Sequence, residues 1–101
     1  MLYKGTEVRL EKSTYSSNDT LAVVMFEEAT GDEYGVITVN LDGYDCLCDD
    51  TRAFLDTNNF PEIREFLEDN NIATYVGCDG ESGFCTYPLY QFDVTKIPDM
   101  N

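Results

Sequence analysis

Carboxylates are the side chains that dominate the chemistry available to this chain. Twenty Asp and Glu stand against six Lys and Arg, no histidine is present, and the formal net charge is -14. No base lies between Lys12 and Arg52, and none lies between Arg64 and Lys96. Such a field repels nucleic acids and anionic membranes, and it steers the chain toward basic surfaces. The sequence therefore predicts a basic protein surface as partner, without direct binding of nucleic acid or membrane.

Three groups of carboxylates are candidates for that contact. The first group lies in the acid-rich loop of residues 42–50. The second follows the apolar run of residues 21–26 and lies in the same stretch without bases. The third lies on an expected helix, where its members are three and four residues apart. On a helix, the Cβ atoms of residues three or four apart lie about 5–6 Å from each other, which is of the same order as the distance between successive phosphates along a nucleic-acid strand. The loop and the apolar run's end are the favoured surface, because loops commonly carry recognition. The candidate partner-binding residues are Glu27, Glu28, Asp42, Asp45, Asp49, Asp50, Glu62, Glu65 and Asp69.

A simpler interpretation of the acids stays open, since a charge-rich face often only keeps a domain in solution. The four cysteines are a second candidate, because four thiolates can close a zinc site. However, the intervals from Cys46 to Cys48 and from Cys78 to Cys85 depart from the usual zinc-knuckle spacing. We expect reduced cysteines that act as small apolar residues, with Cys85 buried in the last strand, and no metal or cofactor. A small metal-binding module remains an alternative.

Catalytic constellations are scarce in this sequence. The absence of histidine removes Cys–His pairs and Ser–His–Asp triads. No glycine-rich phosphate loop occurs, and the acid-rich loop lacks the glycine and glutamate positions of a calcium-binding EF-hand. Pairs of carboxylates are unavoidable among twenty acids, so they carry no information about acid–base catalysis. The sequence predicts a protein that is not an enzyme and has no catalytic residues.

Length and composition favour one folded domain over residues 1–101. A chain of 11.4 kDa can bury a single core, and seven Tyr, six Phe and 43% apolar residues distinguish it from acidic disordered chains. The first residues show no secretory signal pattern, and no apolar run is long enough to span a bilayer. We expect a cytoplasmic location, where thiols stay reduced. The oligomeric state is not indicated.

Strand patterns fill the first part of the chain. Val8 and Leu10 alternate with charged residues, which is typical of a half-buried strand. Residues 21–26 are apolar throughout, which favours a central strand covered on both faces. Residues 36–41 alternate again and predict a third strand. Together they predict an antiparallel meander, followed by a loop over residues 42–58 with a short helical turn near residues 52–55.

One helix is expected over residues 60–70. Asn59 is placed to cap it, and Glu62 lies three residues later as in a capping box. Its apolar side carries Phe60, Ile63, Phe66 and Leu67. Asn70 or Asn71 is suited to the left-handed conformation that ends a helix.

A final hairpin is expected from residues 73–76 and 84–94, around a turn at residues 79–83. Pro88 predicts that the last strand is bulged or lies at an edge, because proline has no ladder donor. The fold class is therefore α+β, with an antiparallel sheet of about five strands and one helix in the order β-β-β-α-β-β. The residues expected to be buried between sheet and helix are Val24, Ile37, Val39, Ile63, Phe66 and Leu67.

Two sequence strings in the second half carry a resemblance to a known group of proteins. These are residues 55–61 (LDTNNFP) and residues 82–90 (SGFCTYPLY), with EFL at 65–67 and NIA at 71–73 between them. They resemble a family of small uncharacterised acidic proteins from conjugative and phage-like elements of Gram-positive bacteria. That family has no established catalytic residues, so none is transferred to this chain.

The resemblance adds a context for the charge. Small, strongly acidic proteins on such mobile elements often resemble anti-CRISPR or anti-restriction inhibitors, and several of these occupy the groove that would hold nucleic acid. The resemblance implies a non-enzymatic inhibitor of a nucleic-acid-handling defence complex, with Cas9 as the first target to consider. The alternative is an accessory protein of the mobile element that acts through another protein partner.

Overall fold

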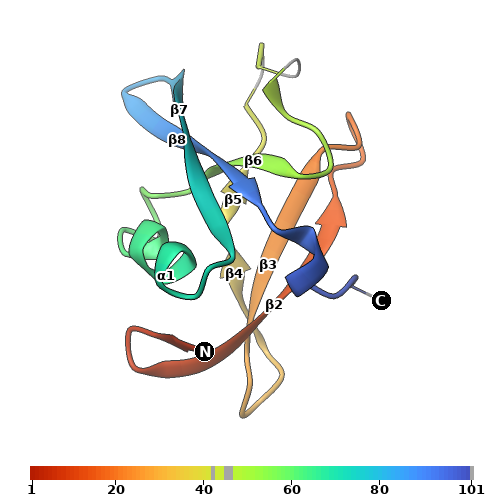
Figure 1. Cartoon of the computed structure of the whole chain (residues 1–101), viewed down its shortest axis with the longest axis vertical. Helices are drawn as coiled ribbons and strands as arrows, with labels where there is room; N and C mark the ends of the chain where they lie inside the picture. The colour runs from red at the N-terminus through yellow and green to blue at the C-terminus, as the bar shows by residue number, and fades with distance from the viewer. Residues whose placement is uncertain (42, 45–46, 101) are drawn as a thin grey trace.

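The computed structural model describes residues 1–41, 43–44 and 47–100. Its strands form two four-stranded antiparallel sheets, with strand orders β1-β2-β3-β4 and β5-β6-β8-β7 (Figure 1). The α+β class, the antiparallel pairing and the helix are as predicted, whereas a single sheet of about five strands is wrong. The elements are β1 (Leu2–Tyr3), β2 (Thr6–Thr14), β3 (Leu21–Glu27), β4 (Glu33–Val36), β5 (Thr38–Val39), β6 (Arg52–Leu55), α1 (Ile63–Asp69), β7 (Ala73–Ser82), β8 (Cys85–Phe92) and the 3-10 helix η2 (Val94–Lys96).

The first sheet is built around β3. Strand β2 pairs with it from Val8 opposite Glu27 to Thr14 opposite Leu21, and β4 pairs on its other side. The first five residues of β3 are buried. This confirms the prediction of a central strand, because a run that is apolar on both faces is stable only when both faces are covered.

The predicted third strand divides between the two sheets at Ile37. Val36 ends β4 opposite Val24, the amide of Ile37 donates to the carbonyl of Val23 at 3.0 Å, and β5 then pairs with β6. Ile37 is fully buried at this crossing point. Alternation along residues 36–41 is compatible with either sheet, so periodicity could not reveal the switch.

Residues 52–55 form strand β6, and the predicted helical turn there is wrong. Strand β6 pairs with β5 on one side and with β8 on the other, and both Phe54 and Leu55 are fully buried. A short apolar run does not distinguish a strand from a helical turn by its periodicity. The neighbouring strands decide the conformation here.

The helix begins later than its capping pattern predicts. Its N-cap is Glu62, which makes no side-chain cap hydrogen bond. Asn59 is instead bound to the buried Asp56, whose carboxylate accepts hydrogen bonds from the Asn59 amide at 3.2 Å and from its side chain at 2.8 Å. The other end agrees with prediction, since Asn71 has a φ of 57° directly after the helix.

The last hairpin is longer than predicted. Strand β7 continues to Ser82, which pairs with Cys85, so the connecting turn is Gly83 and Phe84. Gly83 has a φ of 61°, and glycine at the first position of a two-residue turn is typical of type II′ hairpins. The predicted turn at residues 79–83 was favoured by Asp79-Gly80, but Gly80 lies within β7 and packs on the core.

Pro88 lies in β8, which is an inner strand between β6 and β7. The prediction of an edge strand is therefore wrong for β8 as a whole. The pairing with β6 nevertheless stops at Leu89, one residue beyond Pro88, in keeping with the missing donor. The register irregularity lies across from it in β7, between Tyr75 and Asp79.

Two hydrophobic clusters support the fold. The main cluster joins both sheets to α1 and includes the predicted Ile37, Ile63, Phe66 and Leu67. Val24 is also buried, whereas Val39 is half-buried. Val39 belongs to a second cluster beneath the β7–β8 hairpin. This second cluster consists of Leu41, Phe54 and Leu89, with Val39, Tyr44, Leu47, Cys48, Val76 and Tyr87 packed against them.

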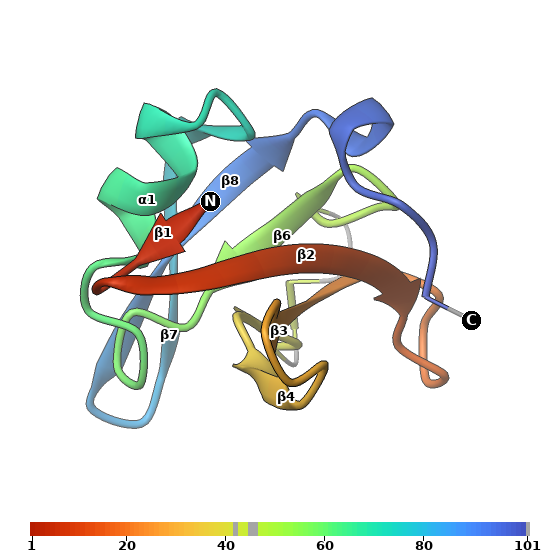
Figure 2. The same ribbon diagram turned by 90° about the horizontal axis from the view of Figure 1, so that it is seen from below.

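The C-terminal segment runs beside the end of β2 (Figure 2). The Lys12 amide donates to the Pro98 carbonyl at 2.8 Å, and the Met100 amide donates to the Lys12 carbonyl at 2.8 Å. These bonds cover part of the otherwise open edge of β2. Within the described residues, no helix is long and apolar enough to cross a membrane.

Candidate functional site

The six basic side chains all take part in contacts within the protein. Each has a carboxylate, carbonyl, amide or phenol partner within the fold. The partners are Glu62 for Lys4 (3.8 Å), Glu11 and Glu28 for Arg9 (2.9 and 3.8 Å), Asp99 for Lys12 (2.8 Å), Gln91 for Arg52 (2.8 Å), Tyr90 for Arg64 (2.9 Å), and the Asn71 carbonyl for Lys96 (2.8 Å). The negative surplus is therefore carried on the surface by carboxylates.

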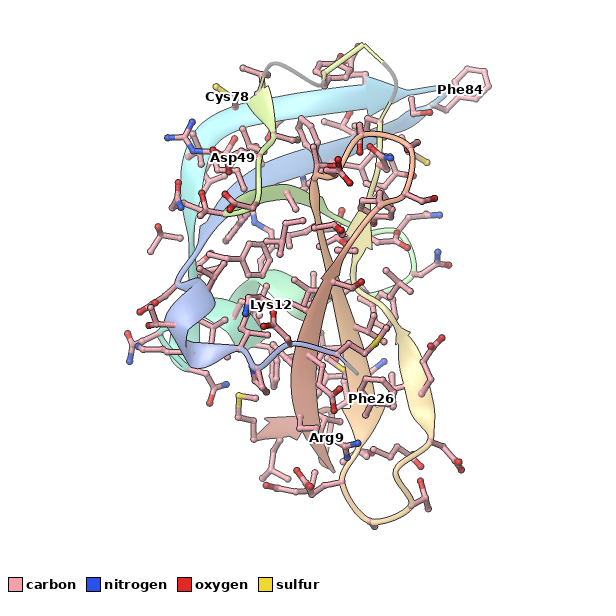
Figure 3. The ribbon with its side chains drawn as sticks, turned by 90° about the vertical axis from the view of Figure 1, so that its right-hand side faces the viewer. Arg9, Lys12, Phe26, Asp49, Cys78 and Phe84 are labelled. Atoms are coloured by element: carbon pink, nitrogen blue, oxygen red, sulfur yellow. The ribbon has the colours of Figure 1, made fainter. Side chains whose placement is uncertain are left out.

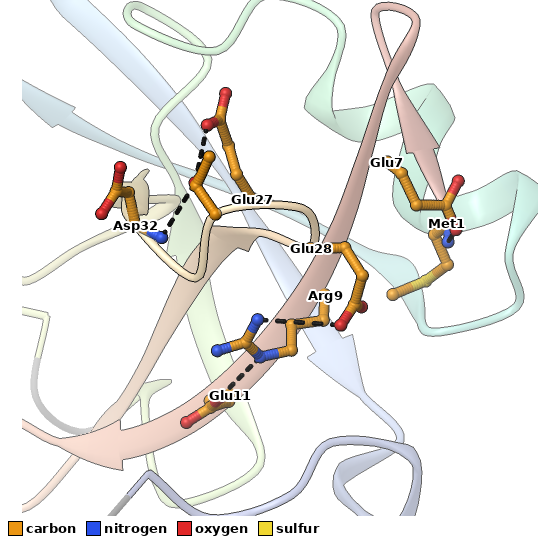
Figure 4. A network of polar contacts seen from close by, with 8 residues as sticks. Met1, Glu7, Arg9, Glu11, Glu27, Glu28 and Asp32 are labelled. Carbon is orange, nitrogen blue, oxygen red and sulfur yellow. Dashed lines mark hydrogen bonds and ion pairs between the residues drawn. The ribbon is translucent and has the colours of Figure 1, made fainter.

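One group of acids surrounds Arg9 on β2 and the β3–β4 turn, and we call it the Arg9 end (Figure 4). Arg9 lies over the ring of Phe26 at 5.0 Å while it pairs with Glu11 and Glu28. Glu27 accepts a hydrogen bond from the Thr30 hydroxyl at 3.0 Å. Both candidate residues at this end thus have partners within the fold. The Arg9 end comprises Glu7, Arg9, Glu11, Glu27 and Glu28.

The acid-rich loop contributes Asp49 and Asp50 to the surface, and both are exposed. The Asp49 carboxylate accepts hydrogen bonds from the Thr51 amide at 2.7 Å, the Thr51 hydroxyl at 2.8 Å and the Arg52 amide at 3.0 Å. The bond from the Thr51 amide is the main reason why the pKa of Asp49 lies below its ordinary value. Asp49 thus fixes the start of β6. Asp42 and Asp45 lie outside the described residues.

The favoured surface of the sequence prediction is divided in space. The Leu21 amide, at the start of β3, donates to the Asp49 carbonyl, whereas Glu27 ends the same strand. Six steps of about 3.3 Å place these two ends about 20 Å apart. Figure 3 shows Asp49 and Arg9 at opposite ends of this sheet. Glu27 and Glu28 therefore do not form one patch with Asp49 and Asp50.

The helix carboxylates are all exposed, as the predicted ridge requires. Glu62 lies just before α1, with its carboxylate 3.8 Å from the Lys4 ammonium. Glu65 and Asp69 follow one helical turn apart, and neither forms a hydrogen bond or an ion pair within the described residues. This pair is the part of the ridge that remains available to an external cation.

A further acidic surface lies on the β7–β8 hairpin, and the sequence analysis did not single it out. We define the hairpin surface as Asp79, Glu81 and Phe84. Asp79 and Glu81 are exposed on the same face of β7, where Asp79 accepts a hydrogen bond from the Tyr75 hydroxyl at 2.7 Å. Arg64 is the nearest preceding base in the chain, and it is held over the rings of Tyr75 and Tyr90 at 4.7 and 5.5 Å.

Phe84 projects from the tip of this hairpin (Figure 3). Its relative exposure is 109%, the largest among the exposed apolar residues of the described chain. The sequence pattern predicts Phe84 as the first residue of the final strand, after a turn at residues 79–83. The signal that would have found it is Gly83, since glycine as the first residue of a two-residue turn places the next residue at the tip.

A hollow of about 410 Å³ lies beside the end of α1, with Glu68, Tyr75 and Asp93 among its lining residues. The Tyr90 hydroxyl donates to Glu68 and accepts from Arg64, and burial raises the pKa of Tyr90. These contacts connect α1 to the second sheet. They serve the structure, since the Arg64 guanidinium and the Tyr90 phenol are both occupied.

The described cysteines are separated. Cys78 and Cys85 have free thiols, with Cys78 exposed on β7 and Cys85 half-buried beside the hairpin turn. The prediction that Cys85 is buried is wrong, because Ser82 and the turn lie next to it instead of the core. Cys46 lies outside the described residues. Across residues 1–41, 43–44 and 47–100, no three Cys, Asp or Glu side chains are grouped so that they could hold a metal ion.

Comparison with known proteins places the chain in a family. Residues 9–101 match a family that is described as a domain of unknown function (DUF4313). The chain belongs to this family. No curated protein and no solved structure matches the chain. Family membership thus covers almost the whole fold, from β2 through the C-terminal segment, and assigns no activity to it.

Proposed function

We propose that this protein is a non-enzymatic binding protein that docks its carboxylates on a basic, nucleic-acid-binding surface of another protein. The observation that carries the proposal is the asymmetry between the two signs of charge. Every cation is already engaged within the fold, whereas a set of carboxylates has no hydrogen bond or ion pair within the described residues. That set consists of Asp19, Asp32, Glu33, Asp50, Glu65, Asp69 and Glu81.

Such a surface imitates a nucleic acid in the property that matters most for affinity. The Lys and Arg of a nucleic-acid-binding groove normally pair with phosphates, and the carboxylates of this protein can pair with the same side chains in a way that salt screens. The net charge of -14 also raises the association rate with a positively charged groove. The partner's groove would then be closed to its guide or target strand.

The resemblance of residues 55–61 and 82–90 to proteins of mobile elements makes Cas9 the first target to test. The experiment measures binding of the full chain to purified guide-free Cas9 by biolayer interferometry from 50 to 500 mM NaCl. We expect binding that weakens steeply with salt and that is abolished when Cas9 is loaded with guide RNA beforehand. Absence of binding at 50 mM NaCl would overturn Cas9 as the target.

Three double variants then locate the contact, each with the same change in net charge. They are Glu65→Lys with Asp69→Lys, Asp49→Lys with Asp50→Lys, and Glu27→Lys with Glu28→Lys. Long-range steering should fall equally in all three, because it depends on total charge. We expect the Glu65/Asp69 variant to raise the dissociation rate about tenfold, since close charge pairs act mainly on dissociation.

The Glu27/Glu28 variant is the matched control for this test. Its carboxylates already contact Thr30 and Arg9, so we expect an effect on the association rate alone. Equal and small effects of all three variants would show that the charge serves solubility, and the binding proposal would lose its physical basis. Capture of a protein that does not bind nucleic acid would instead favour an accessory role.

A further inference from the structure

The tip of the β7–β8 hairpin carries a large apolar side chain that the fold does not use. Phe84 is wholly exposed and contacts neither hydrophobic cluster. The turn itself needs only Gly83, whose φ of 61° is unfavourable for other residues, whereas the second turn position accepts almost any side chain. A polar residue at position 84 would complete the same turn without exposing a ring to water.

The backbone of the hairpin is supported by packing close to its tip. Gly80 lies so close to the second cluster that an added Cβ would be 2.7 Å from Leu41 and 2.8 Å from Phe54. The Glu81 amide also donates to the Tyr44 hydroxyl at 3.2 Å. Because β7 rests on this support nearly to its end, the tip is presented with little conformational freedom to lose on binding.

The charge around the tip indicates the kind of surface that receives it. Asp79 and Glu81 are exposed on β7, and no Lys or Arg occurs anywhere in the hairpin. An apolar pocket with an uncharged or acidic rim would leave these carboxylates without compensation. A pocket rimmed by Lys or Arg would pair with them while it buries the ring. Aromatic anchors surrounded by polar contacts are typical of binding hot spots.

We propose that Phe84 is the apolar anchor of the protein's interface and that it inserts into a hydrophobic pocket with a Lys- and Arg-rich rim. This inference rests on the proposed function, because the pocket is assigned to the same basic partner. Within that interface, the carboxylates accelerate encounter, give salt dependence and form the close charge pairs, and the apolar contact of the ring adds to them. Phe84 slows dissociation.

The test uses the full chain and guide-free Cas9, with rates measured by biolayer interferometry at 150 mM NaCl. Phe84→Ala is expected to raise the dissociation rate about 30-fold, with the association rate and its salt dependence unchanged. Phe84→Leu keeps an apolar side chain and should retain most of the affinity. Thr86→Ala, an exposed change on the same hairpin, is the matched control and should bind like the original protein. Melting temperatures of all variants should agree, since Phe84 makes no core contact.

The outcomes separate this inference from the proposed function. If the original protein binds and Phe84→Ala dissociates at the same rate, the anchor is overturned and the charge-based function stands. If Phe84→Ala changes only the association rate, the anchor is likewise overturned. If the original protein fails to bind even at 50 mM NaCl, the proposed partner is overturned, and the anchor inference falls with it.

Discussion

The Arg9 end and the hairpin surface both carry carboxylates, four at the first and two at the second, but the fold provides partners for them differently. At the Arg9 end, the guanidinium binds Glu11 at 2.9 Å and Glu28 at 3.8 Å while it covers Phe26. On the hairpin surface, the Glu81 carboxylate has no hydrogen bond or ion pair within the described residues, and the Asp79 carboxylate accepts one from the Tyr75 hydroxyl at 2.7 Å. The fold therefore provides cationic partners for three of the four carboxylates at the Arg9 end and for neither carboxylate of the hairpin surface.

This difference shows that acidic composition alone does not mark a binding surface. A carboxylate that is already paired gives up an interaction when it binds a new cation, so its net gain is small. A carboxylate without a partner, next to an exposed aromatic ring, gains more from the same contact. Partners within the fold thus divide the carboxylates of residues 1–41, 43–44 and 47–100 into those that serve the fold and those that are available.

The largest effect should come from the core beneath the hairpin surface. Phe54→Ala is expected to lower the free energy of unfolding by about 3–5 kcal/mol, because Phe54 is fully buried in the second cluster. Urea denaturation monitored by tyrosine fluorescence measures this change. The control is Phe26→Ala at the Arg9 end, where the ring is half-buried and a smaller loss is expected. A loss below about 1 kcal/mol for Phe54→Ala would show that the hairpin does not depend on the second cluster.

A smaller effect should distinguish compensated from uncompensated charge. Arg9→Gln removes two ion pairs and a cation–π contact, so we expect a loss of about 1 kcal/mol at low salt that shrinks in 0.5 M NaCl. Glu81→Gln on the hairpin surface is the matched control and should change stability by less than about 0.5 kcal/mol. Thermal unfolding at both salt concentrations provides the measurement. Equal effects of the two variants would remove the contrast between the two regions.

The smallest effect concerns the pH dependence of Asp49. The hydrogen bond from the Thr51 amide lowers the pKa of Asp49 in the folded protein, so its contribution to stability is present above the unfolded pKa of about 3.9. That contribution is lost as the pH falls through the lower folded pKa. Asp49→Asn should therefore be less stable than the original protein at pH 6, and this difference should fade below pH about 3. Its size should be less than about 1 kcal/mol, because the site is exposed.

Asp50→Asn is the control for this measurement, since its carboxylate accepts no hydrogen bond within the described residues. It should leave stability at pH 6 unchanged in the same series of urea titrations. A difference between Asp49→Asn and the original protein that grows as the pH falls would contradict the structural role of Asp49.

Local patterns in the sequence predicted the elements whose conformation depends on near neighbours. The apolar run of residues 21–25 gave a buried central strand, the stripe of Ile63, Phe66 and Leu67 gave the buried face of α1, and Asn71 ended it. The failures lie where a distant residue competes. Asn59 is expected to cap the helix, but the Asp56 carboxylate binds it, and Asp56 is held by burial and by the hydrogen bond from its amide to the Ile37 carbonyl.

The candidate site was predictable only in part for the same reason. The sequence identified Glu65 and Asp69 as exposed neighbours on a helix, because both lie within one turn of a single element. It joined Glu27 and Glu28 to the loop at Asp49, although the length of β3 separates them. It also placed Phe84 in a strand. Both Asp79-Gly80 and Gly83 are turn signals, and the sequence does not show which of the two glycines packs against the second cluster and therefore lies within β7.

The sequence by itself determined the α+β class, the central strand, the buried face of the helix, and a surface with far more negative than positive charge. The secondary-structure properties follow from side-chain periodicity within a few residues. The surface charge follows from the composition of the whole chain. Only the tertiary structure decided that the chain crosses between two sheets at Ile37, that Arg9 pairs with Glu11 and Glu28, and that Phe84 stands at an exposed tip. Strand partners and ion pairs bring together residues far apart in the sequence, and the packing energy that selects them is not encoded in any single segment.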